Sequence, residues 1–154
     1  MKIFATNLWR QFTVFGRGIH LLDGATGTSL IKAGMPHGCC QEAWILEHPE
    51  VIIELQRSYA KAGSEIIYAP TFQANPLALG RHGLEADMTS INAWLIALSR
   101  KAAPKKLIAG NLTTLRAYMD ISAESNFEHM THIYRTQIHA LVQGGTWRST
   151  PGWR

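Results

Sequence analysis

Short apolar runs alternate with longer segments of helical periodicity along most of this chain. Three such runs lie at residues 18–24 (GIHLLDG), 64–72 (SEIIYAPTF) and 105–112 (KKLIAGNL). Each has a short apolar centre closed by glycine, proline or charged residues, which is typical of a buried strand of about five residues. The pattern therefore predicts three strands inside the protein.

The segments after these runs show helical spacing. A helix is predicted over 49–62, because Pro49 suits a first helical position and Gly63 suits a C-terminal cap. Its expected apolar face consists of Val51, Ile52, Leu55, Tyr59 and Ala62. A shorter helix is predicted before it, within 25–35, ending at Gly34.

Two further helices are predicted from the same periodicity. One spans 88–103 and is capped by Asp87 or Thr89. On this helix, the residues expected to share one face are Ile91, Trp94, Leu95, Leu98 and Ala102. The longest begins with a capping box of Ser125 and Glu128 and ends at a glycine pair. Its expected buried face consists of Phe127, Met130, Tyr134 and Leu141.

Strand and helix alternate in this order three times, without a hairpin turn signal between strands. Repeated βα units imply a parallel sheet, so the predicted fold class is α/β. The units span 18–145 as one domain, preceded by an N-terminal extension at 1–17. A fourth apolar strand is due next, but the chain continues with an atypical C-terminal tail at 146–154, TWRSTPGWR.

The composition is that of a soluble globular protein, with 46% hydrophobic and 17% charged residues among 154. The net charge of +4 is spread singly rather than in a basic stripe, which argues against a nucleic-acid partner. The sequence shows no signal peptide and no apolar run of membrane length. Two cysteines are too few for a disulfide framework. We therefore expect a reduced, cytoplasmic protein with neither a membrane nor a nucleic-acid partner.

Candidate chemistry lies where the predicted strands end. In a parallel sheet, active groups gather at the carboxyl ends of the strands. Asp23 and Gly24 end the first strand, Thr71 follows the second, and Asn111 follows the third. The topology places all of them on one rim of the sheet.

The segment LLDGATGT, residues 21–28, carries Asp23 between a strand and two glycines. Glycine lets the backbone approach a ligand closely. The Asp23 carboxylate can accept hydrogen bonds from an ammonium group, and backbone N–H groups can hold a carboxylate, which suits an amino-acid ligand. The alternative is a plain βα turn in which Asp23 caps the next helix. The glycines do not form the G-x-G-x-x-G fingerprint of a dinucleotide site.

Two other features have a chemical and a plain interpretation. Thr71 can donate a hydrogen bond to a ligand carboxylate, or it can cap the helix that follows. His37 beside Cys39 and Cys40 looks like the start of a metal site. Two adjacent cysteines cannot surround a tetrahedral zinc ion, so we expect no metal site in this chain.

Several segments, in this order, resemble motifs of the homocysteine S-methyltransferase family: LLDGATGT, residues 48–75, HGLE, IAGNL and YRTQIHALVQGG. The resemblance covers 18–145 and is specific when its two long motifs are taken together. It implies a (β/α)8 barrel of about twice this length, of which the chain holds about the first three to four βα units. It also implies an S-methyltransferase, in which zinc holds homocysteine as a thiolate that attacks a methyl donor and gives methionine.

The resemblance implies roles for residues on the rim. The aspartate of the family's first motif binds the amino group of homocysteine and corresponds to Asp23. Gly24, Ala25 and Thr71 complete the expected substrate-binding set. No catalytic residue and no metal ligand is assigned to this chain, because the family's three zinc cysteines follow later strands. Cys40 instead matches the cysteine of another segment, here CQEAWI, which we expect to be a loop.

The chain departs from the family at several points. Thr113 and Thr114 stand where the family has a Gly-Pro pair, and residues 68–70 replace a segment that carries a glutamate in many members. Any contact from that glutamate is therefore absent. Because the family's later strands and zinc cysteines have no counterpart here, we hypothesise a fragment that is inactive alone. Its tail would be a premature end from a frameshifted or truncated reading frame.

An open half-barrel leaves strand edges unpaired, and we expect self-association through that edge. Two other functions stay open at this point. The chain can be an amino-acid-binding or partner-binding βα module without catalysis, or a half-barrel that a second chain completes. Zinc is expected as a cofactor of the full-length family member and not of this chain. The expected partners of the full-length protein are homocysteine and a methyl donor.

Overall fold

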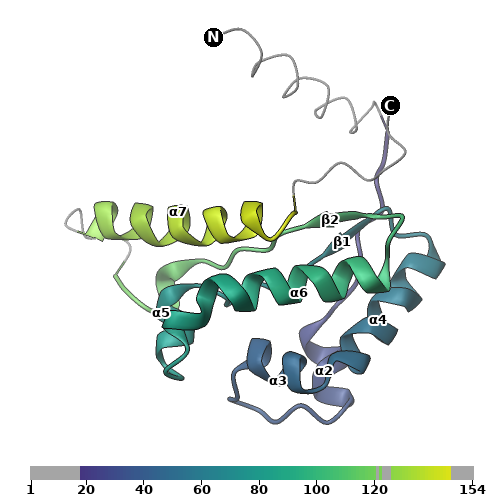
Figure 1. Cartoon of the computed structure of the whole chain (residues 1–154), viewed down its shortest axis with the longest axis horizontal. Coiled ribbons are helices and arrows are strands. Elements are labelled where there is room, and N and C mark those ends of the chain that lie inside the picture. Colours follow the sequence, from purple (N-terminus) through teal and green to yellow (C-terminus); the bar gives the residue numbers. More distant parts are fainter. Residues whose placement is uncertain (1–17, 121, 123–125, 147–154) are drawn as a thin grey trace, which may run out of the picture.

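The structure, a computed structural model, describes residues 18–120, 122 and 126–146. Within them a short parallel sheet lies among helices (Figure 1). Strand β1 (Ile66–Tyr68) and strand β2 (Leu107–Ala109) pair in parallel, with Ile66 opposite Leu107. The second and third predicted strands are confirmed, although each has three residues rather than about five.

The first predicted strand is reduced to a single parallel bridge between Leu22 and Ile66. Its side chains are not buried, since Ile19 is 91% exposed, Leu21 53% and Leu22 48%. An edge segment is buried only where a second layer covers it, and the described residues leave these side chains in solvent. The apolar run correctly indicates pairing, but the prediction of burial is wrong.

Helix α4 (Pro49–Ala62) agrees with its prediction. Pro49 lies in the first turn, and Gly63 ends the helix in the left-handed conformation with a φ of 113°, which glycine adopts without steric cost. The predicted face includes Ala62, which is exposed, so the buried face ends earlier than predicted. The buried residues of α4 are Ile52, Ile53 and Gln56.

Helices α6 (Met88–Ala102) and α7 (Phe127–Gln143) also occupy their predicted segments. Phe127 is predicted on the buried face of α7, and this prediction is wrong because its side chain is 66% exposed. Trp94, expected to share a face with Leu95 and Leu98, is 56% exposed. The two helices pack closely: a Cβ atom added at Gly144 would stand 2.7 Å from a side-chain atom of α6. So close an approach favours small and aliphatic side chains between the helices over large rings.

The helix caps follow the sequence only in part. Asp87 precedes α6, but its side chain makes no capping hydrogen bond. The 3-10 turn η1 (Glu85–Asp87) holds Asp87 at φ −92° and ψ 4°, away from the extended conformation of a capping residue. The predicted cap at Ser125 lies outside the described residues. Gly144 follows α7 as predicted.

Shorter helical segments complete the described part of the chain: α2 (Gly27–Lys32), α3 (Gln41–Glu47), α5 (Pro76–Gly80) and the 3-10 turn η2 (Leu115–Ala117). Helix α2 confirms the short helix predicted before Gly34. Helix α3 overturns the predicted loop at 40–45; with only seven residues it is too short for periodicity to reveal. No helix among the described residues is long and apolar enough to cross a membrane.

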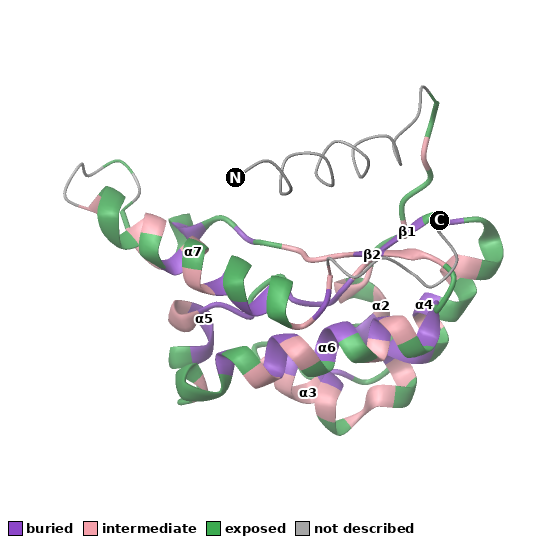
Figure 2. Cartoon of the chain, turned by 45° about the horizontal axis from the view of Figure 1, so that its top comes forward, coloured by how far each residue is buried: buried purple, intermediate pink, exposed green. Residues whose placement is uncertain are grey.

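The core has two parts that meet at α6, and Figure 2 shows buried residues along this helix. One part joins α3, α4 and α6 and contains Ile52 and Leu95. The other joins the strands to α6 and α7 and contains Ile67 and Leu141. The second part packs the strands against α6 and α7, so the carboxyl ends of the strands have a fixed place relative to these helices.

Candidate functional site

The side chain of Asp23 forms the last rung between the first segment and β1. Parallel pairing is regular here: the amide of Ile66 donates to Leu21 O (3.3 Å), and the amide of Asp23 donates to Ile66 O (3.2 Å). In this ladder the next donor, the amide of Tyr68, should meet the backbone carbonyl of Asp23. It donates instead to the Asp23 carboxylate oxygen Oδ2 (3.1 Å). The carboxylate thus closes the ladder, and the backbone is free to turn at Gly24.

Half-burial of Asp23 affects its ionisation. Desolvation raises the pKa of Asp23 above its ordinary value of 3.8, and hydrogen bonds from backbone amides, including that of Tyr68, partly oppose the rise. The alternative in which Asp23 caps the next helix is wrong. Helix α2 begins after Thr26 without a side-chain cap, because the carboxylate is engaged with β1.

The turn formed by residues 23–25, called the 23–25 turn below, rests against α4. The hydroxyl of Tyr59 donates to Ala25 O (2.9 Å). A Cβ atom added at Gly24 would lie 2.9 Å from the Tyr59 ring, so only glycine fits there without a shift. Ser29 of α2 also donates to Ala25 O (2.7 Å). Three of the predicted site residues therefore lie together, at the carboxyl end of the sheet.

Thr71 is fully buried directly after β1. Its hydroxyl accepts a hydrogen bond from the amide of Asn111 (2.9 Å) and donates to the carbonyl of the same residue (3.0 Å). Its own carbonyl accepts from Gln137 of α7 (2.8 Å). The donor expected to reach a ligand carboxylate is engaged with Asn111. Capping of the next helix by Thr71 is wrong, because Asn75 caps α5 by accepting from two amides.

Two buried polar side chains that the sequence pattern does not mark hold the same region. Glu42 of α3 is 1% exposed, and its Oε1 accepts from the amide of Gln73 (2.9 Å) in the loop after β1. Desolvation raises the pKa of Glu42, and the bond from Gln73 partly opposes the rise. Gln56 of α4 donates to Tyr68 O (2.9 Å). Glu42 lies on the short helix α3 and Gln56 on the amphipathic helix α4. Because both are polar, hydrophobic periodicity places them on the exposed faces of these helices.

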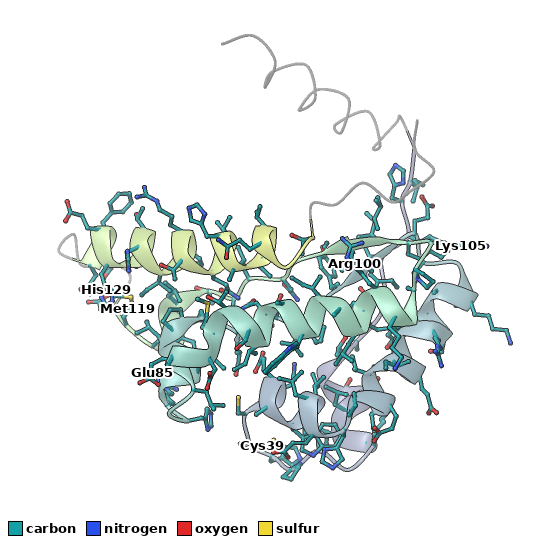
Figure 3. All side chains as sticks on the ribbon, viewed as in Figure 1. Cys39, Glu85, Arg100, Lys105, Met119 and His129 are labelled. Atoms are coloured by element: carbon teal, nitrogen blue, oxygen red, sulfur yellow. The ribbon has the colours of Figure 1, made fainter. Side chains whose placement is uncertain are left out.

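The residues present do not fit a zinc ion. Within the described ranges, no three His, Cys, Asp or Glu side chains converge as metal ligands. Cys39 is exposed before α3 and donates to Pro36 O (3.1 Å), whereas Cys40 is half-buried near Glu42 (3.9 Å). Figure 3 shows Cys39 beside α3, with α6 between it and α7. The cysteine pair does not provide a tetrahedral set of ligands.

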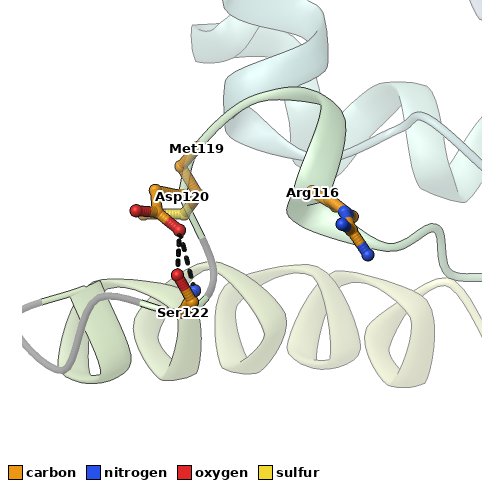
Figure 4. Close-up of a pocket in the computed structure, with 4 residues that line it drawn as sticks. All are labelled: Arg116, Met119, Asp120 and Ser122. Atoms are coloured by element: carbon orange, nitrogen blue, oxygen red, sulfur yellow. Dashed lines mark hydrogen bonds between the residues drawn. The ribbon is translucent and has the colours of Figure 1, made fainter.

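A hollow of about 580 Å³ lies elsewhere, in the segment after η2 (Figure 4). Its lining residues are Arg116, Met119, Asp120 and Ser122. Asp120 accepts from the amide (2.9 Å) and the hydroxyl (2.6 Å) of Ser122. None of the predicted substrate-binding residues lines this hollow, so it is separate from the site at the rim.

Comparison with known proteins points to one family. The family model described as homocysteine S-methyltransferase matches residues 20–146. The homocysteine S-methyltransferase of Escherichia coli strain K12 is 28% identical over 148 residues, which cover 82% of this chain and 47% of that protein.

Solved structures agree. The homocysteine methyltransferase MmuM from Escherichia coli in its metallated form superposes with a TM-score of 0.71 at 26% identity, covering 86% of this chain and 53% of that one. Its oxidized form gives a TM-score of 0.70 at 25% identity, covering 86% and 52%. This chain spans about half the length of these relatives. The match over residues 20–146, which contains the rim, shows that the chain belongs to the homocysteine S-methyltransferase family.

Proposed function

We propose that this chain forms the homocysteine-binding part of an S-methyltransferase, in which Asp23 holds the amino group of the substrate. The observation that carries the proposal is a half-buried carboxylate fixed by the amide of Tyr68 at the carboxyl end of a parallel sheet. A charge in such low-dielectric surroundings attracts an ammonium group more strongly than a charge in water does. An ammonium group beside Asp23 would also favour the ionised carboxylate and so lower its raised pKa.

The rest of the 23–25 turn complements this contact. Gly24 and Ala25 are exposed, and we assign their backbone N–H groups to the substrate carboxylate, which such groups at turns bind well. Thr71 supports this site indirectly, because its hydroxyl bonds the loop after β1 to Asn111 in the loop after β2. The substrate-binding set is therefore Asp23, Gly24 and Ala25 in contact, with Thr71 holding the rim.

The proposed reaction is methyl transfer from a donor to the sulfur of homocysteine, giving methionine, in the cytoplasm. The proposed complete fold is a (β/α)8 barrel, of which this chain would form about the first three to four βα units. Parallel pairing of β1 and β2, with helices between them along the chain, supports this proposal. A zinc-bound thiolate is the nucleophile in the family, but the described residues hold no ligand set for zinc. This chain's own residues bind and orient the substrate, and we propose that the chain is inactive alone.

Titration of this chain with L-homocysteine in a calorimeter tests the proposal. The informative variant is Asp23→Asn, because asparagine keeps an oxygen that can accept from Tyr68 but removes the charge. We expect the Kd to rise about tenfold or more, as for the loss of a charged hydrogen bond. Asp87→Asn, at an exposed aspartate before α6, controls for net charge and should leave the Kd unchanged.

A second ligand isolates the amino group. 4-Sulfanylbutanoic acid has the thiol and the carboxylate of homocysteine but no amino group, so it should bind wild type and Asp23→Asn equally weakly. Equal affinity of the wild type for homocysteine and for this analogue would contradict the assignment of Asp23 to the amino group.

A further inference from the structure

Tyr59 touches the 23–25 turn in two independent ways. Its hydroxyl donates to Ala25 O at 2.9 Å, across 34 residues of sequence. Its ring fills the space where a side chain at position 24 would stand: a Cβ atom there would lie 2.9 Å from Cε1 and 3.0 Å from Cζ. The turn therefore contacts both the ring and the hydroxyl of Tyr59.

The two partners differ in how firmly the fold holds them. Tyr59 is carried by α4, a helix of 14 residues, and packs against the core part that contains Ile67. The 23–25 turn belongs to no helix and no named strand. Ser29 also bonds to Ala25 O, but it lies in α2, which the turn itself leads into. Asp23 is bonded to β1 through Ile66 and Tyr68, and Tyr59 is the contact that relates the rest of the turn, Gly24 and Ala25, to α4.

We propose that Tyr59 is a positioning residue that sets the place of Asp23 and of the backbone N–H groups of Gly24 and Ala25. Only the expected effect of Tyr59 on homocysteine binding rests on the function proposed above. Its structural part stands on the hydroxyl bond to Ala25 and the close fit of the ring to Gly24. The Tyr59 hydrogen is donated to a backbone carbonyl, so its role is to hold the turn rather than to exchange a proton with a substrate.

A double-mutant cycle tests the fit between the ring and the glycine. Gly24→Ala pushes a methyl group into the ring of Tyr59, and we expect the unfolding equilibrium constant to rise about fivefold or more, as overpacking does. In a Tyr59→Ala background the space is open, and the same substitution should change that constant by less than about twofold. Equal effects in the two backgrounds overturn the proposed fit.

Amide exchange tests whether Tyr59 controls the place of Asp23. The Tyr68 amide donates to the Asp23 carboxylate (3.1 Å), so its exchange rate reports the turn. The Ala69 amide donates to Ala109 O (2.8 Å) and reports the sheet itself. In Tyr59→Phe, which keeps the ring, we expect exchange at Tyr68 to quicken about three- to tenfold, with little change at Ala69.

The matched control is Tyr134→Phe. Tyr134 of α7 also donates from its hydroxyl to a backbone carbonyl, but that carbonyl belongs to Thr113 (3.1 Å) and not to the 23–25 turn. If Tyr59 only adds to overall stability, the two variants should affect the Tyr68 amide alike. An equal effect of the two, or no effect of Tyr59→Phe, overturns the positioning role.

Homocysteine binding completes the test and separates the two proposals. We expect Tyr59→Phe to raise the Kd for L-homocysteine about three- to tenfold and Tyr134→Phe to leave it unchanged. If the wild type does not bind homocysteine, the proposed function fails for this chain, and the cycle and the exchange rates alone decide the role of Tyr59. If exchange at Tyr68 quickens and the Kd stays the same, the turn is held by Tyr59 but its place does not matter to the substrate, and the positioning proposal is overturned.

Discussion

The hydroxyl of Thr71 makes two hydrogen bonds with the backbone of one residue, Asn111, accepting at 2.9 Å and donating at 3.0 Å. It joins the loops after β1 and β2 as a further rung would join two strands. Gln137 of α7 bonds to the carbonyl of the same threonine. Thr71, a residue expected to contact the ligand, therefore joins the loop after β1 to the loop after β2 and to α7.

Replacing Thr71 by valine should destabilise the protein. Valine has nearly the same shape but leaves the amide and the carbonyl of Asn111 without their partner. We expect the free energy of unfolding, measured in urea, to fall by about 1–3 kcal/mol. Thr71→Ser keeps the hydroxyl and loses one methyl group, so its loss should be about 1 kcal/mol. A valine variant as stable as the serine variant would show that the bonds to Asn111 contribute little.

Glu42→Gln should change the dependence of stability on pH. Burial raises the pKa of Glu42 in the folded protein above its ordinary value of 4.5, so the folded state binds the proton more tightly than the unfolded chain does. The stability of the wild type should therefore fall as the pH rises from 4.5 through the raised pKa. Glutamine is neutral throughout and its oxygen can still accept from Gln73, so the variant should gain stability relative to the wild type over this range.

The measurement is the difference in unfolding free energy between variant and wild type at several pH values. Taking the difference removes the contribution of Asp23, whose pKa is also raised. Glu54→Gln, on the exposed side of α4, controls for the loss of one negative charge. A difference between Glu42→Gln and wild type that is the same at every pH would contradict the expected linkage.

Gly63→Ala should weaken the end of α4. Gly63 has a φ of 113°, where a side chain is strained, and we expect a loss of about 1–2 kcal/mol in the free energy of unfolding. Gly18→Ala is the control, since a Cβ atom there meets nothing within 4 Å. Similar unfolding midpoints for both variants would show that the cap at Gly63 is relaxed.

The purified chain should not retain zinc. Cys39 and Cys40 are adjacent, and the described residues contain no group of three ligands around one point. After dialysis, mass spectrometry of the metal content should find far less than one zinc per chain. Stoichiometric zinc that disappears in a double Cys39→Ser, Cys40→Ser variant would contradict this expectation and assign the metal to the pair.

Local signals predict much of this fold. Pro49 and Gly63 delimit α4 as expected, and the runs around Ile67 and Ile108 form the parallel strands. The place of Asp23 at a strand end follows from the same pattern. Each of these features depends on neighbours within a few residues, which is what periodicity and turn chemistry record.

The contacts that hold the rim have no local signature. Tyr59 reaches Ala25 across 34 residues, and Glu42 reaches Gln73 across 31. Such contacts depend on how the helices pack against the sheet, and helical spacing reveals only that Tyr59 lies on an apolar face. For the same reason, the outward position of Trp94 was not predictable from its spacing with Leu95 and Leu98.

Because the Asp23 carboxylate bonds to the Tyr68 amide, position 23 has two separate requirements, one for folding and one for ligand binding. A library of all substitutions there, selected first for folding and then for retention on an immobilised amine-bearing ligand, should pass through two filters of different width. Folding requires an acceptor atom at the length of an aspartate or asparagine side chain, because the Tyr68 amide needs one. Recognition of an ammonium group requires the negative charge as well. The variants that survive the first selection and are lost in the second would therefore show which requirement at position 23 comes from folding and which comes from ligand binding.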